Sequence, residues 1–166
     1  NAVCFTDANK GTTVGDNGTI LRTTNGGTNW ILQLSGTANS LYCASFIDAN
    51  TGTVAGDSGT ILRTINGGTN WTSQSISPTH SLISVCFTDA NTGTVVDNFV
   101  SIFRTTNGGT NWTSSQILTP LLLSVSFADA NTGTVVNSMG RIFRTTNGGN
   151  NWISQSSGTT KSLYCV

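Results

Sequence analysis

Few side chains in this sequence could carry out chemistry, and most of them recur at a fixed spacing. The 166 residues include one histidine, His80, and seven aspartates but no glutamate. Four of the aspartates follow an apolar segment at equivalent places: Asp7, Asp48, Asp89 and Asp129. Glycoside hydrolysis needs two carboxylates with different roles, so four equivalent aspartates are better explained as turn formers. The lone histidine has no second imidazole and no Ser-His-Asp motif beside it, so we interpret it as solvated.

The cysteines leave three interpretations open. All four fall on one face of an expected strand: Cys4, Cys43, Cys86 and Cys165. They can be small buried side chains, as free cysteines often are. They can form disulfides between adjacent strands or, through Cys4 and Cys165, between protomers, which requires Cα atoms within about 7 Å. A metal or haem site is the least favoured, because no C-x-x-C spacing occurs.

The arginines are the best candidates for binding a partner. Four of them occupy equivalent positions and would emerge at the same point of successive units: Arg22, Arg63, Arg104 and Arg144. A ring of like charge attracts an anionic partner. In the alternative interpretation, each arginine pairs with a loop aspartate or covers a neighbouring tryptophan.

A repeat of about 41 residues positions these side chains. One tryptophan and one phenylalanine recur at steps of 41, 41 and 40 residues: Trp30, Trp71, Trp112, Trp152, and Phe5, Phe46, Phe87, Phe127. The period divides the chain into units 1–40, 41–81, 82–121 and 122–162, and 163–166 begin a fifth. Self-similarity at this period is typical of propellers and other repeat folds.

Each unit is predicted to form four short strands. In the second unit these are 41–46, 52–55, 60–63 and a strand centred on 71–74. The segments between them are rich in Asp, Asn and Gly, which is the composition of turns. Four strands in each unit, without helical periodicity, predict an all-β propeller of four tandem blades.

The first strand of each unit is expected to be buried on both faces, because neither face carries a charge. A bulky face against a small one would let successive blades nest. In the second unit the bulky face consists of Tyr42, Ala44 and Phe46, and the small face of Leu41, Cys43 and Ser45.

The end of the chain repeats the start of the second unit. Leu163-Tyr164-Cys165-Val166 matches Leu41-Tyr42-Cys43-Ala44, so both ends would compete for one strand position in a closed four-bladed ring. This favours a segment of a longer propeller, or protomers that continue one another head to tail as a homo-oligomer or filament.

Composition excludes several classes of partner. The net charge is zero and 8% of residues are charged, against about 25% in globular proteins. No Lys/Arg cluster is present to bind nucleic acid. The longest apolar run, 121–123, follows Pro120 and is far shorter than the about 20 residues of a membrane span, so we expect no membrane insertion. The richness in Thr, Asn, Ser and Gly indicates a secreted protein, located outside the cell or at its surface.

The segment Thr23-Thr24-Asn25-Gly26-Gly27-Thr28-Asn29-Trp30 resembles the Asp-box turn of BNR and sialidase-type propellers. With the preceding Phe-x-Asp-Ala-Asn pattern, the whole chain is similar to Ycf48-type repeats. In such a turn the Asx side chain bonds backbone N–H groups, the glycines take positive φ and the tryptophan packs on the hairpin. We therefore interpret the boxes as structural, with Asn in place of the Asp of the box. Their residues are Thr23, Asn25, Gly27 and Trp30; Thr64, Asn66, Gly68 and Trp71; Thr105, Asn107, Gly109 and Trp112; Thr145, Asn147, Gly149 and Trp152.

The two resemblances imply different functions. The sialidase resemblance implies an arginine triad, a Tyr nucleophile with a Glu partner, and an Asp acid. This chain has no Glu, and its two tyrosines, Tyr42 and Tyr164, occupy equivalent positions on the face expected to be buried. The Ycf48 resemblance implies that a patch of arginines binds a partner.

We therefore predict a non-catalytic extracellular propeller that serves as a structural or protein-interaction scaffold and assembles into a larger ring or filament. The alternatives are a carbohydrate-binding, lectin-like propeller and a sialidase-like glycosidase. We expect a protein or a second copy as the partner, or a glycan in the alternative, and no catalytic residue, cofactor or metal. Specificity is expected where the repeat is broken, at 98–100, 117–123 and 138–141.

Overall fold

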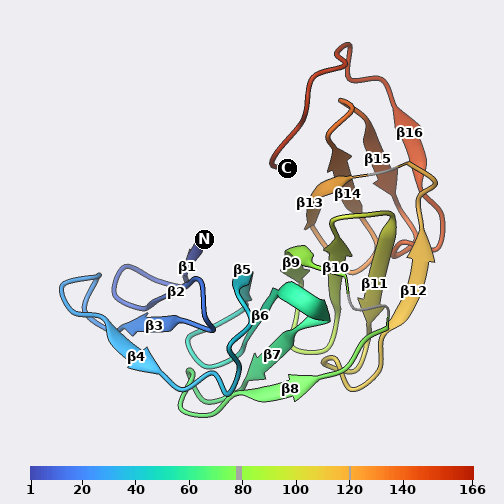
Figure 1. Cartoon of the computed structure of the whole chain (residues 1–166). Coiled ribbons are helices and arrows are strands. Elements are labelled where there is room, and N and C mark those ends of the chain that lie inside the picture. Colours follow the sequence, from blue (N-terminus) through green and yellow to red (C-terminus); the bar gives the residue numbers. More distant parts are fainter. Residues whose placement is uncertain (78–79, 120) are drawn as a thin grey trace. The chain divides into compact units, whose positions relative to one another are not determined.

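The chain forms four antiparallel sheets of four strands each (Figure 1). The structure is a computed structural model that describes residues 1–77, 80–119 and 121–166; Pro78 and Pro120 lie outside the described residues. In each sheet the strand order follows the chain, for example β1-β2-β3-β4. One repeat therefore makes one up-and-down sheet, which confirms the predicted four-bladed, all-β propeller class.

The strands are short, as the predicted four per unit require. The first sheet contains β1 (Ala2–Phe5), β2 (Gly11–Val14), β3 (Ile20–Thr23) and β4 (Ile31–Gln33). The second contains β5 (Leu41–Phe46), β6 (Gly52–Gly56), β7 (Ile61–Thr64) and β8 (Thr72–Gln74). The third contains β9 (Leu82–Phe87), β10 (Gly93–Asp97), β11 (Ser101–Thr105) and β12 (Thr113–Gln116). The fourth contains β13 (Leu122–Phe127), β14 (Gly133–Asn137), β15 (Ile142–Thr145) and β16 (Ile153–Gln155).

Helix is almost absent from the described part of the chain. It consists of one 3-10 turn, η1 (Asp57–Gly59), between β6 and β7. Among the described residues there is accordingly no helix with the length and apolarity to cross a membrane.

Burial decreases from the second strand of a sheet to the fourth. All five residues of β6 are buried, and so are all five of β10. The fourth strands β4 and β8 are largely exposed. Each blade therefore ends in a solvent-facing edge strand that is paired on one side only.

The chain divides into two compact units, Asn1–Leu82 and Ile83–Val166. In the first unit, Val14 and Ile20 of the first blade form one buried cluster with Leu41, Val54 and Leu62 of the second. The second unit has the same arrangement, in which the third and fourth blades share a cluster. Within each unit the core therefore lies between two blades, and its members in the second unit are Val96, Ile102, Ile117, Leu122, Val125, Phe127, Val135 and Phe143.

The prediction that Leu41 and the pair Ala44 and Phe46 lie on opposite faces of the first strand was wrong. The pairing of β5 with β6 shifts between Leu41 and Cys43, as a β-bulge does. The extra residue reverses the alternation, so Leu41 is fully buried in the cluster on which Ala44 and Phe46 pack. The tyrosines are not buried either: Tyr42 is half-buried and Tyr164 is 76% exposed.

Shortening Leu41 tests this packing. Leu41→Ala should lower the free energy of unfolding by about 2–5 kcal/mol, because a fully buried side chain leaves a cavity between two blades. Urea denaturation followed by tryptophan fluorescence measures the change. Leu118→Ala is the control, since Leu118 is 92% exposed and its loss should cost less than about 0.5 kcal/mol. Equal effects of the two substitutions would contradict the packing.

Candidate functional site

The four box turns share one pattern of hydrogen bonds. In the first, the Thr23 hydroxyl accepts the N–H of Gly27 at 2.9 Å, and Oδ1 of Asn25 accepts the N–H of Asn29 at 3.0 Å. Gly27 has a φ of 88°, where a side chain would be strained. The corresponding bonds of the other boxes measure 2.8–2.9 Å and 2.9–3.0 Å. The polar atoms of the Thr and Asn side chains are thus engaged by the turn itself.

The box tryptophan packs on the phenylalanine that ends the first strand of the same blade. The ring centroids of Phe5 and Trp30 lie 6.0 Å apart in an edge-to-face arrangement. The other three pairs are 6.0–6.2 Å apart with the same geometry. The aromatic pair links the innermost strand of each blade to its outermost hairpin.

The repeated aspartates form turns rather than a catalytic pair. Oδ1 of Asp48 accepts the N–H groups of Asn50 at 2.6 Å and Thr51 at 2.8 Å. The equivalent aspartates 7, 89 and 129 make the same two bonds. These backbone bonds stabilise the charged carboxylate and lower the pKa of all four groups below its usual range.

Arg22 joins the first blade to the second. Arg22 donates to the Thr12 hydroxyl at 2.8 Å in its own sheet and to the carbonyl of Ala49 in the next. Its guanidinium carbon lies 5.5 Å from the ring centroid of Phe46, within the range of a cation–π contact. The alternative interpretation expected Arg22 to pair with an aspartate or to cover a tryptophan. It instead donates to the carbonyl of Ala49 and covers the ring of Phe46.

The other repeated arginines differ in what they reach. Arg104 repeats the contacts of Arg22: it donates to Thr94 and to the carbonyl of Ala130 and lies 4.8 Å from the Phe127 ring. Arg63 donates to Thr53 at 3.1 Å. Burial lowers the pKa of all three guanidinium groups, which stay charged at neutral pH. Arg144 is exposed, Arg63 and Arg104 are half-buried, and Arg22 is buried.

The four cysteines are free thiols. Burial raises the pKa of Cys43 to about 12 and also raises that of Cys86, so neither is a thiolate at neutral pH. Cys86 instead accepts the N–H of Phe127 at 3.3 Å, on the first strand of the following blade. Cys4 is half-buried and Cys165 is exposed. Disulfides within the chain are therefore not formed in this structure, whereas a bond between protomers stays a prediction.

Two of the three breaks in the repeat have structural explanations. At 98–100, Oδ1 of the buried Asp97 accepts the N–H groups of Phe99 and Ser101 and shapes the turn. In the segment 117–123, Ile117 and Leu122 are buried in the core between the third and fourth blades.

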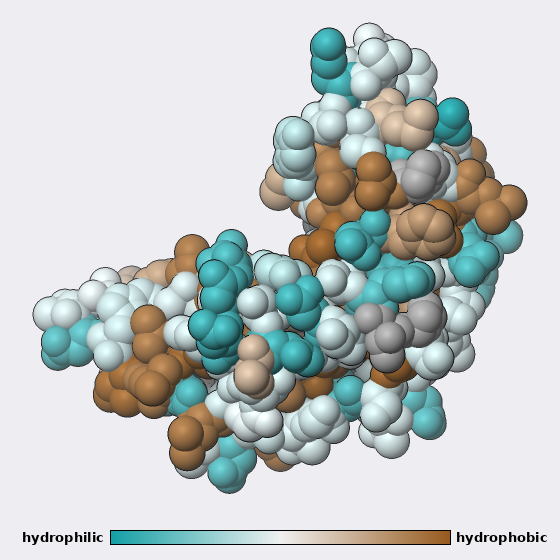
Figure 2. Space-filling view, viewed as in Figure 1, coloured by the Kyte–Doolittle hydropathy of each residue, from teal (hydrophilic) through white to brown (hydrophobic). Residues whose placement is uncertain are grey.

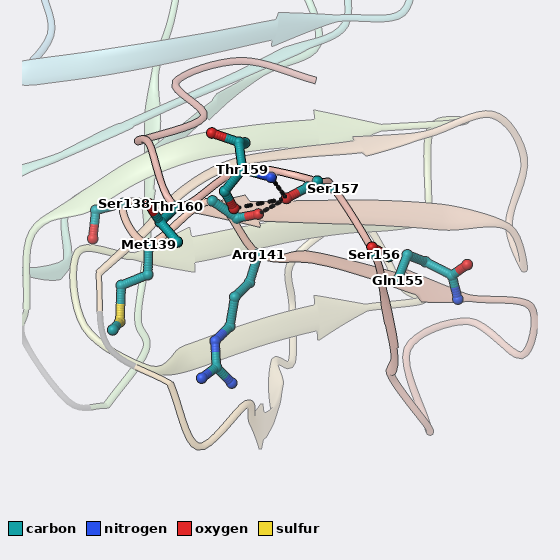
Figure 3. A pocket seen from close by; sticks show the side chains of 10 residues that line it. Ser138, Met139, Arg141, Gln155, Ser156, Ser157, Thr159 and Thr160 are labelled. Atoms are coloured by element: carbon teal, nitrogen blue, oxygen red, sulfur yellow. Dashed lines mark hydrogen bonds between the residues drawn. The ribbon is translucent and has the colours of Figure 1, made fainter.

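The third break forms one wall of a groove on the fourth blade. Residues 138–141, in the turn between β14 and β15, line a cavity of about 820 Å³ together with residues 155–160, which include the end of β16. In the view of Figure 3, the side chains of Met139 and Arg141 extend from the turn in the same direction. Arg141 is exposed and Met139 is 48% exposed.

A buried asparagine holds this groove in shape. Asn137 is fully buried, and its Oδ1 accepts the N–H groups of Met139 at 3.0 Å and Arg141 at 2.9 Å. Its Nδ2 donates to Thr119 at 2.9 Å. On the opposite wall, the Ser157 hydroxyl donates to the carbonyls of Gly140 and Thr159 (Figure 3). Asn137 was not among the predicted site residues, and the signal in the sequence is that the first two units carry glycine, Gly15 and Gly56, at its position.

Positive charge gathers on the blade that contains this groove. Residues 122–162 hold three cations, Arg141, Arg144 and Lys161, against one aspartate, which is a net charge of +2. The whole chain is neutral. At the position of Arg141 the other three units have Thr19, Thr60 and Ser101, so this cation belongs to the fourth blade alone.

The repeated boxes on four-stranded blades define a BNR-type repeat propeller. The chain belongs to the family described as photosynthesis system II assembly factor YCF48, whose family model matches residues 1–119 and 31–164. The search of curated proteins found no match.

Solved structures resemble the chain in fold. A YCF48 protein bound to a D1 peptide has a TM-score of 0.78 and 22% identity, covering 99% of this chain and 55% of that one. YCF48 from Cyanidioschyzon merolae has a TM-score of 0.61 and 16% identity, with 98% and 87% covered. A GH74 xyloglucanase from Xanthomonas campestris has a TM-score of 0.72 and 13% identity, with 97% and 31% covered. The chain thus spans about half the length of the peptide-bound relative.

The family match corrects the predicted function and location. An extracellular scaffold was wrong, because the family is that of an assembly factor for photosystem II, and the lectin and glycosidase alternatives gain no better support. The error has a physical origin. Thr, Asn and Gly are what four sets of strands and turns require, so their abundance reports the repeat and not the compartment.

Removing the inter-blade contacts of one arginine tests their role in stability. Arg22→Ala should lower the free energy of unfolding by about 1–3 kcal/mol, because it removes bonds from a charged group and a cation–π contact. Arg144→Ala, at the equivalent but exposed position, is the matched control and should leave urea denaturation unchanged. If both substitutions destabilise the protein alike, the arginines do not act by joining blades.

The aspartate turns predict a loss of stability in acid. Each carboxyl has a lower pKa in the folded than in the unfolded protein, so its contribution is complete above the unfolded pKa of about 3.9. That contribution disappears as the pH falls through the lower folded value. Thermal unfolding between pH 6 and pH 2 measures this, and replacing the four turn aspartates by Asn should flatten the profile below about pH 4. If the variant loses stability below pH 4 as the wild-type protein does, groups other than these aspartates cause the acid sensitivity.

Proposed function

We propose that this chain is a non-catalytic binding module of the assembly-factor type, which holds an acidic segment of a partner protein in the groove of the fourth blade. The observation that carries the proposal is the cation Arg141 in the wall of a cavity of about 820 Å³. Its guanidinium can donate two parallel bonds to one carboxylate. Arg144 and Lys161 add long-range attraction from the same blade.

A protein segment fits this groove better than the other partners suggested by the sequence. The related YCF48 structure was solved bound to a D1 peptide, which favours a polypeptide over a glycan or a second copy. The groove is lined by serine and threonine side chains and loop backbone, with Met139 as an exposed apolar contact. Such a surface offers hydrogen bonds to a main chain and one apolar anchor.

The proposal that the chain is not an enzyme rests on how its acidic groups are used. The four repeated aspartates accept backbone N–H bonds in turns, and their pKa values are lowered rather than raised. A general acid needs the opposite shift at neutral pH. The buried thiols Cys43 and Cys86 have raised pKa values, which makes them poor nucleophiles.

The test uses a fluorescein-labelled D1 peptide and the full chain. Binding should be measurable by fluorescence anisotropy and should weaken as salt is added, because the contact is ionic. Arg141→Gln should weaken it at least tenfold, which corresponds to about 1.4 kcal/mol. Failure of the wild-type chain to bind at low salt would contradict the proposal for this peptide.

Two controls locate the effect. Lys10→Gln removes one positive charge from the first blade, outside the groove, and should leave binding unchanged. Arg144→Gln distinguishes the groove from the repeated arginines as the binding site. A large loss of peptide binding with Arg144→Gln and none with Arg141→Gln would show that the peptide binds at Arg144 and not in the groove.

A further inference from the structure

The outermost strand of the first blade carries exposed leucines where the other three blades carry polar residues. Leu32 lies in β4 and Leu34 directly follows it, and they are 66% and 90% exposed. The residues equivalent to Leu32 are Ser73, Ser114 and Ser154, and those equivalent to Leu34 are Ser75, Gln116 and Ser156. All six are exposed as well. The repeat thus keeps these two positions in solvent on every blade, and on one blade it fills them with leucine.

The backbone beside these leucines is open to pairing. β4 pairs with β3 on one side, with Leu32 opposite Leu21, and it is the last strand of its sheet. The N–H and C=O groups on the other edge are a template for a further strand. Proteins usually protect such an edge with charges or proline, yet the segment 31–34 contains neither.

A groove lies at the Leu34 end of β4. Leu32 and Leu34 line it together with the turn 17–19 and the loop 35–38, and its volume is about 460 Å³. It is the first blade's equivalent of the groove that contains Arg141, but none of its lining residues is charged. Figure 2 shows apolar surface where Figure 1 places β4.

The area and the hydrogen-bonding groups of this surface favour an extended peptide over a second copy or a lipid surface. Two leucine side chains offer at most a few hundred Å², well below the roughly 800 Å² per partner of a stable dimer, so a second copy gains too little. A lipid surface leaves the edge N–H and C=O groups without partners. An extended peptide satisfies both, because strand addition supplies main-chain bonds while a pocket selects side chains.

We propose that β4 is a docking edge for an uncharged, extended segment of a partner protein, which adds as a fifth strand and places apolar side chains two residues apart over Leu32 and Leu34. Residues two apart on a strand share one face, so a single segment can use the edge and the groove together. This site is independent of the acidic-segment groove on the fourth blade.

The test probe is a capped, fluorescein-labelled peptide of alternating valine and threonine, titrated with the full chain. Wild-type protein should bind it without dependence on salt. The double substitution Leu32→Ser and Leu34→Ser gives the first blade the residues of the second, and it should weaken binding at least tenfold. Because both side chains are exposed, urea denaturation should be unchanged. A probe N-methylated at every residue keeps the side chains but loses the main-chain donors of both edges, and it should not bind.

The remaining outcomes overturn the proposal. Equal binding of the methylated probe would mean apolar contact without strand addition. A dimer in light scattering that the double substitution dissociates would assign the edge to a second copy. Sedimentation with phosphatidylcholine vesicles, lost in the double variant, would assign it to a lipid surface. Ile153→Ser, an exposed apolar change on the fourth blade, is the matched control, and loss of binding there would show that the site is not on β4.

Discussion

The structure depends on one constraint: a four-stranded sheet of about 41 residues has two apolar faces and cannot bury either of them alone. Each unit of the chain meets it by placing its core between two blades, with the contributions of Val14 and Ile20 on one side and Leu41 and Val54 on the other. The burial of Leu41 depends on the bulge in β5, which turns it toward the core. Two arginines add hydrogen bonds between the blades. Arg22 and Arg104 each connect a strand of one blade to a turn of the next.

The same constraint explains why the conspicuous residues are not functional. Boxes and turn aspartates recur because every blade needs the same closure, and the polar groups of the box threonines and asparagines and of the turn aspartates are engaged within the repeat. A site that acts once in the molecule must be a departure from the repeat. Arg141 and the pair Leu32 and Leu34 are such departures, and both occur beside the same kind of groove. One is cationic and the other is apolar and uncharged, so a shared framework supports two different surfaces.

Much of the fold could be predicted from the sequence, because strand and turn chemistry are local. The predicted strand 41–46 coincides with β5, the predicted strand 52–55 ends one residue before β6 does, and the predicted strand 60–63 is shifted from β7 by one residue at both ends. The bulge at Tyr42 could not be predicted, since the alternation of side chains carries no sign of one extra residue. The partners of Arg22 were also out of reach. Ala49 and Phe46 lie 27 and 24 residues away on another blade, and the sequence suggested an aspartate or a tryptophan where the structure has a carbonyl and a phenylalanine.

The candidate grooves were predicted only in part, for a reason that follows from their construction. Residues 138–141 stand out in the sequence because they break the repeat, but the loop 155–160 that forms the other wall follows the repeat closely. Leu32 and Leu34 were missed because a leucine in a strand is usually a core residue. Comparison of the same position in four blades reveals the difference, since three of them carry polar side chains in solvent. In a repeat protein, an apolar residue at a position that the other copies keep polar and exposed therefore indicates a surface with a partner.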